Sequence, residues 1–193
     1  MNESAQVCYS HYSSPVGELL ITSSDGMLTG LHMSLHRGGP APRPKPEWGR
    51  DDPALRLARE QLKAFFAGEL RAFELPLRMT GTPFQEQVWE GLLTIPYGTT
   101  ISYAELARRI GRPGASRAVG AANGRNPIGI VVPCHRVIGA DGTLTGYGGG
   151  LDRKEWLISH EANVLGSQIR ANAPEAVVAN PRTRPFLKDN SHA

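Results

Sequence analysis

Residues 102–123 read SYAELARRIGRPGASRAVGAAN, which is two short helical patterns separated by a turn. Ser102 with Glu105 three residues later forms a capping-box pattern that begins the first helix. Residues 111–114 end this helix and form the turn, and a second helix is predicted over residues 115–123. Two short helices joined by a glycine-containing turn are typical of a helix-turn-helix.

The second of these helices has an unusual composition for a DNA-reading helix. It presents Ala, Ser, Val and Gly, and Arg117 is its single long polar side chain. A helix that reads the major groove normally carries several side chains that reach base edges. Small residues allow close approach to the sugar-phosphate backbone, and one arginine can fill the space of a displaced base, which fits the minor groove and nucleotide extrusion. The segment alone fits an Ala/Gly helix packed inside a bundle equally well.

The charge distribution agrees with a nucleic-acid partner. The formal net charge is only +3, but residues 106–140 contain six arginines and no acidic residue. Arginine suits phosphate forks and stacking better than lysine does. The arginines are Arg108, Arg109, Arg112, Arg117, Arg125 and Arg136. Phosphate binding and an ordinary solvated basic surface both remain open from charge alone.

After the helix-turn-helix comes Pro133-Cys134-His135-Arg136-Val137, preceded by an apolar run over residues 128–132 that is expected to be buried. A thiolate is the nucleophilic form of cysteine, and it requires a base or positive charge. His135 is the nearest base, and Glu161 on the last predicted helix is the carboxylate expected to orient it. Adjacent residues on an extended segment point apart, so a bridging water is expected between Cys134 and His135. Taken alone, Cys134 fits an inert buried thiol as well.

The N-terminal part predicts mixed strands and helix. Strands are expected over residues 16–22 and 27–32 around a hairpin turn at 24–26, followed by an exposed loop over 36–52. A helix beginning at Pro53 and a short strand over 73–77 complete this unit. The expected domains are 1–79, an α/β unit, and 80–166, a helical unit that begins with a capping box at Thr82. A flexible tail is expected over 167–193, after a last helix capped by Asp152.

Two cysteines do not make a disulfide framework, so a reducing, cytoplasmic location is expected. No apolar stretch reaches the length of a membrane span, and neither a membrane partner nor a secretory signal is expected.

Several of these segments together resemble the active-site signature of the O6-alkylguanine-DNA alkyltransferases, the methylated-DNA–protein-cysteine methyltransferases. The resemblance is strong from about Thr82 to Gly166 and weaker over the first 79 residues. It is carried by Tyr97-Gly98, Ser102-Tyr103, Arg117-Ala118-Val119-Gly120, Asn126-Pro127, Val132-Pro133-Cys134-His135-Arg136-Val137-Ile138, Tyr147 to Gly150 and Lys154-Glu155-Trp156-Leu157. It implies an α/β (α+β) fold with a small ribonuclease H-like N-terminal unit and a C-terminal winged helix-turn-helix-like unit.

The resemblance also implies roles, residue by residue. Cys134 would accept the alkyl group from O6 of guanine, with His135 as water-mediated base and Glu161 polarising it. Asn126 would brace the turn before the active-site strand, and Tyr103 would press the 3′ phosphate and protonate the leaving guanine. Arg117 would fill the gap left by the flipped base. The implied DNA-binding residues are Tyr103, Ala104, Arg112, Ser116, Arg117, Ala118 and Gly120. The implied substrate pocket is Val137, Tyr147, Gly148 and Lys154, with backbone groups of Cys134 and Val137 reading the guanine edge.

The implied activity is a single-turnover transfer that needs no cofactor. The partner is double-stranded DNA carrying alkylated guanine (O4-alkylthymine being a second lesion left open), and the protein is expected to be a monomer. Two positions depart from the pattern. Gly148 stands where many relatives hold a serine beside O6, which predicts a pocket open to larger alkyl groups. Some relatives bind zinc through two cysteines and two histidines, but here only Cys8 lies near His11, His32 and His36, so no metal site is expected.

Three other functions compete with this one. A non-catalytic relative that binds alkylated DNA would lack the acceptor cysteine. A redox-sensing helix-turn-helix regulator would carry base-reading side chains on its second helix. A cysteine hydrolase would turn over many times. The presence of Cys134 and the small residues of the helix favour the alkyltransferase.

Overall fold

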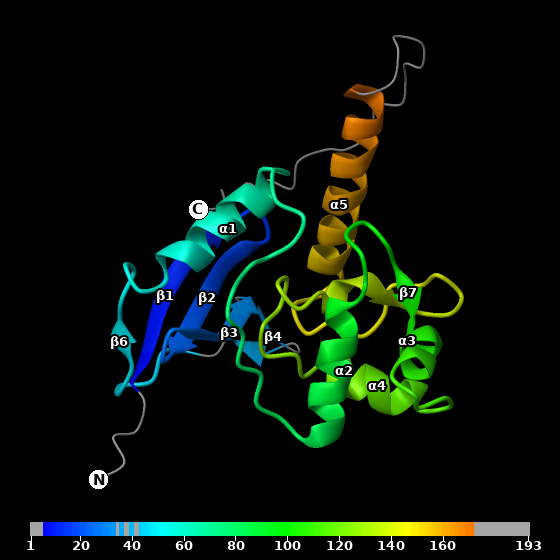
Figure 1. The fold of residues 1–193 in the computed structure, drawn as a ribbon, viewed down its shortest axis with the longest axis horizontal. Helices are drawn as coiled ribbons and strands as arrows, with labels where there is room; N and C mark the ends of the chain where they lie inside the picture. Colours follow the sequence, from blue (N-terminus) through cyan, green and yellow to red (C-terminus); the bar gives the residue numbers. More distant parts are fainter. Residues whose placement is uncertain (1–5, 34, 37–38, 41–42, 172–193) are drawn as a thin grey trace, which may run out of the picture.

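The computed structural model describes residues 6–33, 35–36, 39–40 and 43–171. Figure 1 shows a sheet with one covering helix at the N-terminal end of the chain, and beside it a group of helices from the C-terminal part. The expected α+β class is confirmed. The strands are β1 (Val7–Ser14), β2 (Gly17–Ser24), β3 (Met27–Met33), β4 (Leu35–His36), β5 (Gly39–Pro40), β6 (Gly49–Arg50), β7 (Ile101–Ser102) and β8 (Val137–Ile138). The helices are α1 (Arg56–Phe66), α2 (Pro83–Leu93), α3 (Tyr103–Arg109), α4 (Ser116–Asn123), the 3₁₀ turn η1 (Cys134–Arg136) and α5 (Leu151–Ala171).

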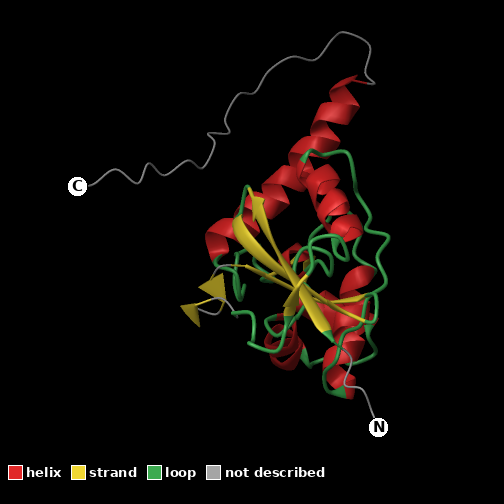
Figure 2. Ribbon diagram, turned by 90° about the vertical axis from the view of Figure 1, so that its left-hand side faces the viewer, coloured by secondary structure: helices red, strands yellow, loops and turns green. Residues whose placement is uncertain are grey.

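The N-terminal sheet has the order β3-β2-β1-β6, with β6 parallel to β1 and the other pairs antiparallel. The predicted hairpin is confirmed, because Asp25 and Gly26 both have positive φ, as a type I′ turn requires. In β2, Leu19, Leu20 and Ile21 are all buried although neighbours in a strand face opposite sides. Both faces of the sheet are therefore covered, one of them by α1 (Figure 1), and Figure 2 shows the sheet from the side with helices around it.

Helix α1 confirms the predicted apolar stripe, since Leu62 and Phe65 are buried on it. Two other predictions in this region are wrong. The loop over residues 36–52 contains β6, which pairs with Cys8 and Tyr9 of β1. Residues 73–77 make no strand, because only Leu77 forms a bridge, to Leu28. A proline at position 76 has no N–H to donate, which prevents a continuous ladder there.

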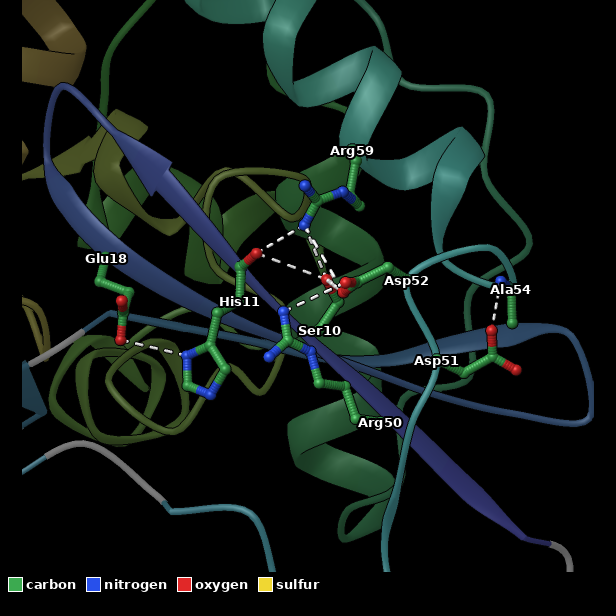
Figure 3. Close-up of polar contacts among 8 residues, drawn as sticks. All are labelled: Ser10, His11, Glu18, Arg50, Asp51, Asp52, Ala54 and Arg59. Atoms are coloured by element: carbon green, nitrogen blue, oxygen red, sulfur yellow. Dashed lines mark hydrogen bonds and ion pairs between the residues drawn. The ribbon is translucent and has the colours of Figure 1, made fainter.

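A polar cluster ties the sheet to the start of α1 (Figure 3). The hydroxyl of the fully buried Ser10 donates to Asp52 Oδ1 over 2.5 Å, and Arg59 donates to Ser10 Oγ over 2.7 Å. Arg59 also donates to the His11 carbonyl. The hydrogen bond from Ser10 is the main reason that the pKa of Asp52 lies below its ordinary value. All of these partners belong to the N-terminal unit, so the cluster stabilises that unit. None of its residues lines the two cavities described below.

The C-terminal unit confirms the predicted helix-turn-helix as α3 and α4. The capping box at Thr82 is complete, since its side chain accepts from Gln85 N while the Gln85 side chain accepts from Thr82 N. The box at Ser102 is only half formed. Glu105 pairs instead with Arg108 and Arg109, one turn further along α3.

Helix α4 is amphipathic. Val119 and Ala122 are buried, and Trp89 of α2 donates its indole N–H to the Ala122 carbonyl over 2.9 Å. Arg117 and Ala118 lie on the exposed side. The alternative of a helix buried all round in a bundle is therefore wrong.

Helix α5 differs from the prediction at both ends. Asp152 lies inside its first turn and not at the cap. The helix also continues through residues 167–171, where a flexible tail was expected. The rest of that tail lies outside the described residues. Among the residues that are described, no helix is long and apolar enough to cross a membrane.

The two parts of the chain meet where β3 lies beside residues 127–129. Leu31 N donates to the Pro127 carbonyl over 2.9 Å, and Gly129 N donates to the Leu31 carbonyl over 3.0 Å. Arg153 of α5 donates to the Val16 carbonyl over 2.6 Å. The N-terminal sheet is thus hydrogen-bonded to the segment that leads to Cys134.

Candidate active site

Cys134 begins the 3₁₀ turn η1 and is buried. The active-site strand that the resemblance implies does not form before Cys134, because residues 129–131 form a turn and only Ile128 makes a bridge, to Leu31. Ile130 has a φ of 69°, which a β-branched residue adopts only under strain. Successive side chains of a 3₁₀ helix diverge by about 120°, so Cys134 and His135 still point in different directions.

Two asparagines hold this segment. Asn126 accepts from Ile128 N over 3.0 Å and donates to the Val132 carbonyl over 2.7 Å. Its side chain therefore replaces the ladder bonds that a strand would have provided, in the bracing position that was expected. Asn123, at the end of α4, donates to the Cys134 carbonyl over 3.3 Å, a contact that the sequence did not indicate.

Behind Cys134, one buried carboxylate joins three parts of the chain. Glu161 Oε1 lies 2.9 Å from His135 Nε2, as the expected relay requires. Arg136 donates to the same carboxylate through Nε and Nη2, at 3.0 and 2.8 Å. Glu161 Oε2 also accepts from Gly98 N over 2.8 Å. Arg136 also donates from Nη1 to the Ile95 carbonyl over 2.6 Å, so all three nitrogens of its guanidinium donate hydrogen bonds.

The electrostatics fix the protonation states of this network. Burial alone would raise the pKa of Glu161, but hydrogen bonds from His135 and Arg136 outweigh it and bring the pKa to about 2. Burial lowers the pKa of His135, against the opposing effect of Glu161. His135 is therefore neutral near pH 7, with Nε2–H donated to the carboxylate. Its Nδ1 is buried without a hydrogen-bond partner among the described residues and is free to accept a proton.

The thiol itself is protonated in the resting protein. Burial raises the pKa of Cys134, while a hydrogen bond from Asn126 and the charge of Lys154 act in the opposite direction. The proton therefore has to leave the thiol during the reaction, which is the task expected of His135 as the base.

Lys154 was expected to line the substrate pocket, but neither it nor Val137 lines the cavity beside Cys134. The side chain of Lys154 is fully buried and donates to the carbonyls of Val137 and Thr145 over 2.6 and 2.7 Å. Burial lowers its pKa to about 8. The Val137 carbonyl, expected to read guanine, already accepts this bond and retains one lone pair. Val137 itself is fully buried.

A cavity of about 30 Å³ adjoins Cys134. Tyr147, Gly148 and Gly149 line one side of it, which agrees with the expected pocket for the first two. Leu31, His32 and Met33 of β3 line another side, which no local sequence pattern indicates, because β3 lies far from Cys134 along the chain.

A second, larger hollow of about 420 Å³ lies over the helix-turn-helix. Its lining includes five of the expected DNA-binding residues, and Ala140, Thr145 and Gly146 complete it. The five are Tyr103, Ala104, Ser116, Arg117 and Gly120. Arg112 and Ala118 are exposed but do not line it. The Tyr103 hydroxyl donates to the Thr145 carbonyl over 2.9 Å, and burial raises the pKa of Tyr103.

No metal site forms in the part of the chain that is described, since no three His, Cys, Asp or Glu side chains there lie close enough to hold an ion. His11 pairs with Glu18 at 3.1 Å. The side chain of His36 lies outside the described residues.

Comparison with known proteins matches both parts of the chain. The model of the 6-O-methylguanine DNA methyltransferase ribonuclease-like domain covers residues 7–79, and that of the DNA-binding domain covers 83–163. A methylated-DNA–protein-cysteine methyltransferase of Mycobacterium tuberculosis is 52% identical over 153 residues, 79% of this chain and 91% of the relative. One from Methanosarcina acetivorans is 46% identical over 155 residues, 80% and 98% of the two chains.

The crystal structure of Mycobacterium tuberculosis OGT in complex with DNA superposes with a TM-score of 0.76 at 50% identity, covering 81% of this chain and 94% of that one. The class of protein is therefore a DNA methyltransferase of the 6-O-methylguanine type, which has two parts: an N-terminal sheet and a C-terminal helix-turn-helix with a buried cysteine. The chain belongs to the methylated-DNA–protein-cysteine methyltransferase family.

Proposed function

We propose that the protein repairs DNA by transferring the alkyl group from O6 of guanine to Sγ of Cys134, once per molecule. The observation that carries the proposal is the sequence of an acceptor thiol, a base and a carboxylate (Cys134, His135 and Glu161) in a domain whose helix-turn-helix bears an open hollow. Tyr103, which lines this hollow, is close enough to Cys134 for the two groups to affect each other's charge, and a regulator or a hydrolase would not need such an arrangement.

The proton leaves Cys134 through His135. Nδ1 of His135 accepts it through one bridging water, because the two side chains point in different directions, while Nε2–H stays on Glu161. Glu161 remains ionised because its pKa of about 2 lies far below neutral pH. The positive Lys154 stabilises the thiolate that forms.

The sulfur then displaces the base. The bond from the alkyl carbon to Sγ forms as the bond to O6 breaks, and the electron pair leaves with guanine. The Tyr103 hydroxyl, which is protonated because burial raises its pKa, gives its proton to the leaving base. The proton taken up by His135 then returns to the tyrosinate through water, so that no net charge remains on the protein. Nothing in this arrangement activates water toward a thioether, so the product stays on Cys134.

The lesion reaches Cys134 only after it leaves the duplex stack, which costs about a few kcal/mol. The hollow of about 420 Å³ that Tyr103 and Arg117 line has the size to receive a nucleotide. We assign Arg117 to the vacated position in the duplex, and double-stranded DNA carrying alkylated guanine as the partner of a monomer in the cytoplasm.

The central test weighs the intact protein after incubation with duplex DNA that contains O6-methylguanine. We expect a gain of one methyl group per molecule, and none in Cys134→Ala. Cys8→Ala is the matched control, because Cys8 lies in β1 away from the site, and it should still gain the methyl. Turnover beyond one equivalent, or a methylated Cys134→Ala protein, would contradict the proposal.

Arg117→Ala is expected to slow transfer from duplex DNA by about 10- to 100-fold, since it removes the group that offsets part of the cost of extrusion. Transfer from the free base O6-benzylguanine should change little. The ratio of the two single-turnover rates is the measurement. Arg125→Ala, an exposed arginine outside the hollow, is the control. An equal loss on both substrates would assign Arg117 a role in the pocket and not in extrusion.

A further inference from the structure

The cavity beside Cys134 is closed on one side by the N-terminal sheet. Met33, the last residue of β3, lines it and is almost completely buried. Leu31, two residues earlier, makes both hydrogen bonds that join β3 to residues 127–129. The strand therefore has a fixed position relative to the acceptor cysteine.

Met33 is in direct contact with the loop on the other side of the cavity. A Cβ atom built on Gly149 would lie 2.4 Å from Met33 Sδ and 2.9 Å from Tyr147 Cε1. A side chain at position 149 would therefore have to displace the methionine. The thioether of Met33 and the ring of Tyr147 thus close the cavity together, from two parts of the chain that are far apart in sequence.

The transfer of the alkyl group requires room in the cavity beside Cys134. The sulfur attacks the alkyl carbon opposite to O6, so the remaining substituents of that carbon project sideways from the Sγ–C–O6 line. A methyl group has only hydrogens to place there, but a benzyl group has a ring. The cavity, at about 30 Å³, holds one or two water-sized groups. It accommodates a methyl group, and a ring enters only if a wall moves.

Among the wall groups, Met33 is the one suited to move. Its unbranched side chain has three rotatable bonds and adapts to irregular spaces. The opposite wall at Gly148 and Gly149 is backbone, and Leu31 is held by its hydrogen bonds.

We propose that Met33 is a specificity-determining residue, which sets the largest alkyl group that the protein can transfer. The N-terminal unit thereby takes part in substrate selection through a side chain that faces the acceptor. This inference rests on the proposed alkyl transfer to Cys134, and it assigns the size limit to Met33 instead of to Gly148 alone.

The test compares single-turnover rates of methyl and benzyl transfer from the same duplex carrying O6-methylguanine or O6-benzylguanine. Met33→Ala should raise the benzyl-to-methyl rate ratio by about tenfold or more, the usual effect of a few methylene groups in an apolar pocket. Met33→Leu has similar volume but a stiffer, branched chain, and should lower the ratio. Met79→Ala makes the same chemical change at a partly buried methionine outside the cavity and should leave the ratio unchanged.

The outcomes separate the two proposals. Absence of methyl transfer by the unmodified protein would reject the proposed function. Normal methyl transfer with a ratio unaltered in both Met33 variants would overturn the role of Met33. If thermal melting shows that Met33→Ala is unfolded, the Met33→Leu ratio decides, because that substitution conserves core volume. If Met79→Ala shifts the benzyl-to-methyl rate ratio as much as Met33→Ala does, the proposed role of Met33 is also overturned.

Discussion

Glu161→Gln is expected to lower the free energy of unfolding by about 3–5 kcal/mol and to slow methyl transfer at least 100-fold. The stability loss follows because Arg136 and its buried charge would lose their carboxylate partner. The rate loss follows because His135 would lose the group that fixes its Nε2–H tautomer. Urea unfolding and single-turnover kinetics measure the two effects.

The matched control is Glu155→Gln, an exposed carboxylate on the same helix. It should change neither quantity appreciably. If Glu161→Gln leaves the free energy of unfolding unaltered, the ion pair between Arg136 and Glu161 makes no net contribution to stability. If it leaves the rate of methyl transfer unaltered, Glu161 has no part in the proton relay.

The same carboxylate makes a pH-dependent contribution to stability. Its pKa is about 2 in the folded protein, against an ordinary value near 4.5. A lowered carboxyl pKa stabilises the fold above the unfolded value, and that stabilisation is lost as pH falls from about 4.5 toward 2. Its size is about 3 kcal/mol. We expect the acid unfolding curve of Glu161→Gln to be flatter than that of the unmodified protein across this interval.

Lys154→Met is expected to slow methyl transfer at pH 7 by about tenfold for each pKa unit that the Cys134 thiol rises when the neighbouring charge is removed. It should also change the pH profile. Lys154, with a pKa of about 8, loses its charge above that pH, so the unmodified protein should slow on the alkaline side. The variant has no such group and should show no alkaline decline.

Rates of methyl transfer between pH 6 and 10 provide the measurement, and Lys63→Met, an exposed lysine on α1, is the control. An alkaline decline that persists in Lys154→Met would assign it to another group, and Tyr103, whose ring centre lies 5.8 Å from Lys154 Nζ, is the next candidate.

The sequence predicted those parts of the molecule whose signals are local. The helices of the C-terminal unit are recognisable because the Thr82 cap of α2, the Ser102 cap of α3 and the glycine turn before α4 lie beside the helices that they define. Cys134 and His135 are adjacent, and the relay to Glu161 was expected from the chemistry of a thiol that needs a base.

What the sequence could not predict depends on distant contacts. An apolar run such as 128–132 suits a buried strand and a buried series of turns equally, and the side-chain bonds of Asn126 decide between them. Arg136 was counted only as a basic residue, because nothing local indicates that it binds a carboxylate 25 positions away. The β3 wall of the cavity depends on how the two parts of the chain pack, which no local pattern specifies.

The shared position of Glu161 also affects how this protein tolerates sequence change. One carboxylate holds the base of the reaction, the Gly98 amide after α2 and, through Arg136, the Ile95 carbonyl. Substitutions there damage chemistry and folding together, so inactive but well-folded variants should be rare at this position. A library of position-161 variants sorted only for soluble expression would therefore be enriched in repair-competent molecules, although no step of the sorting involves DNA.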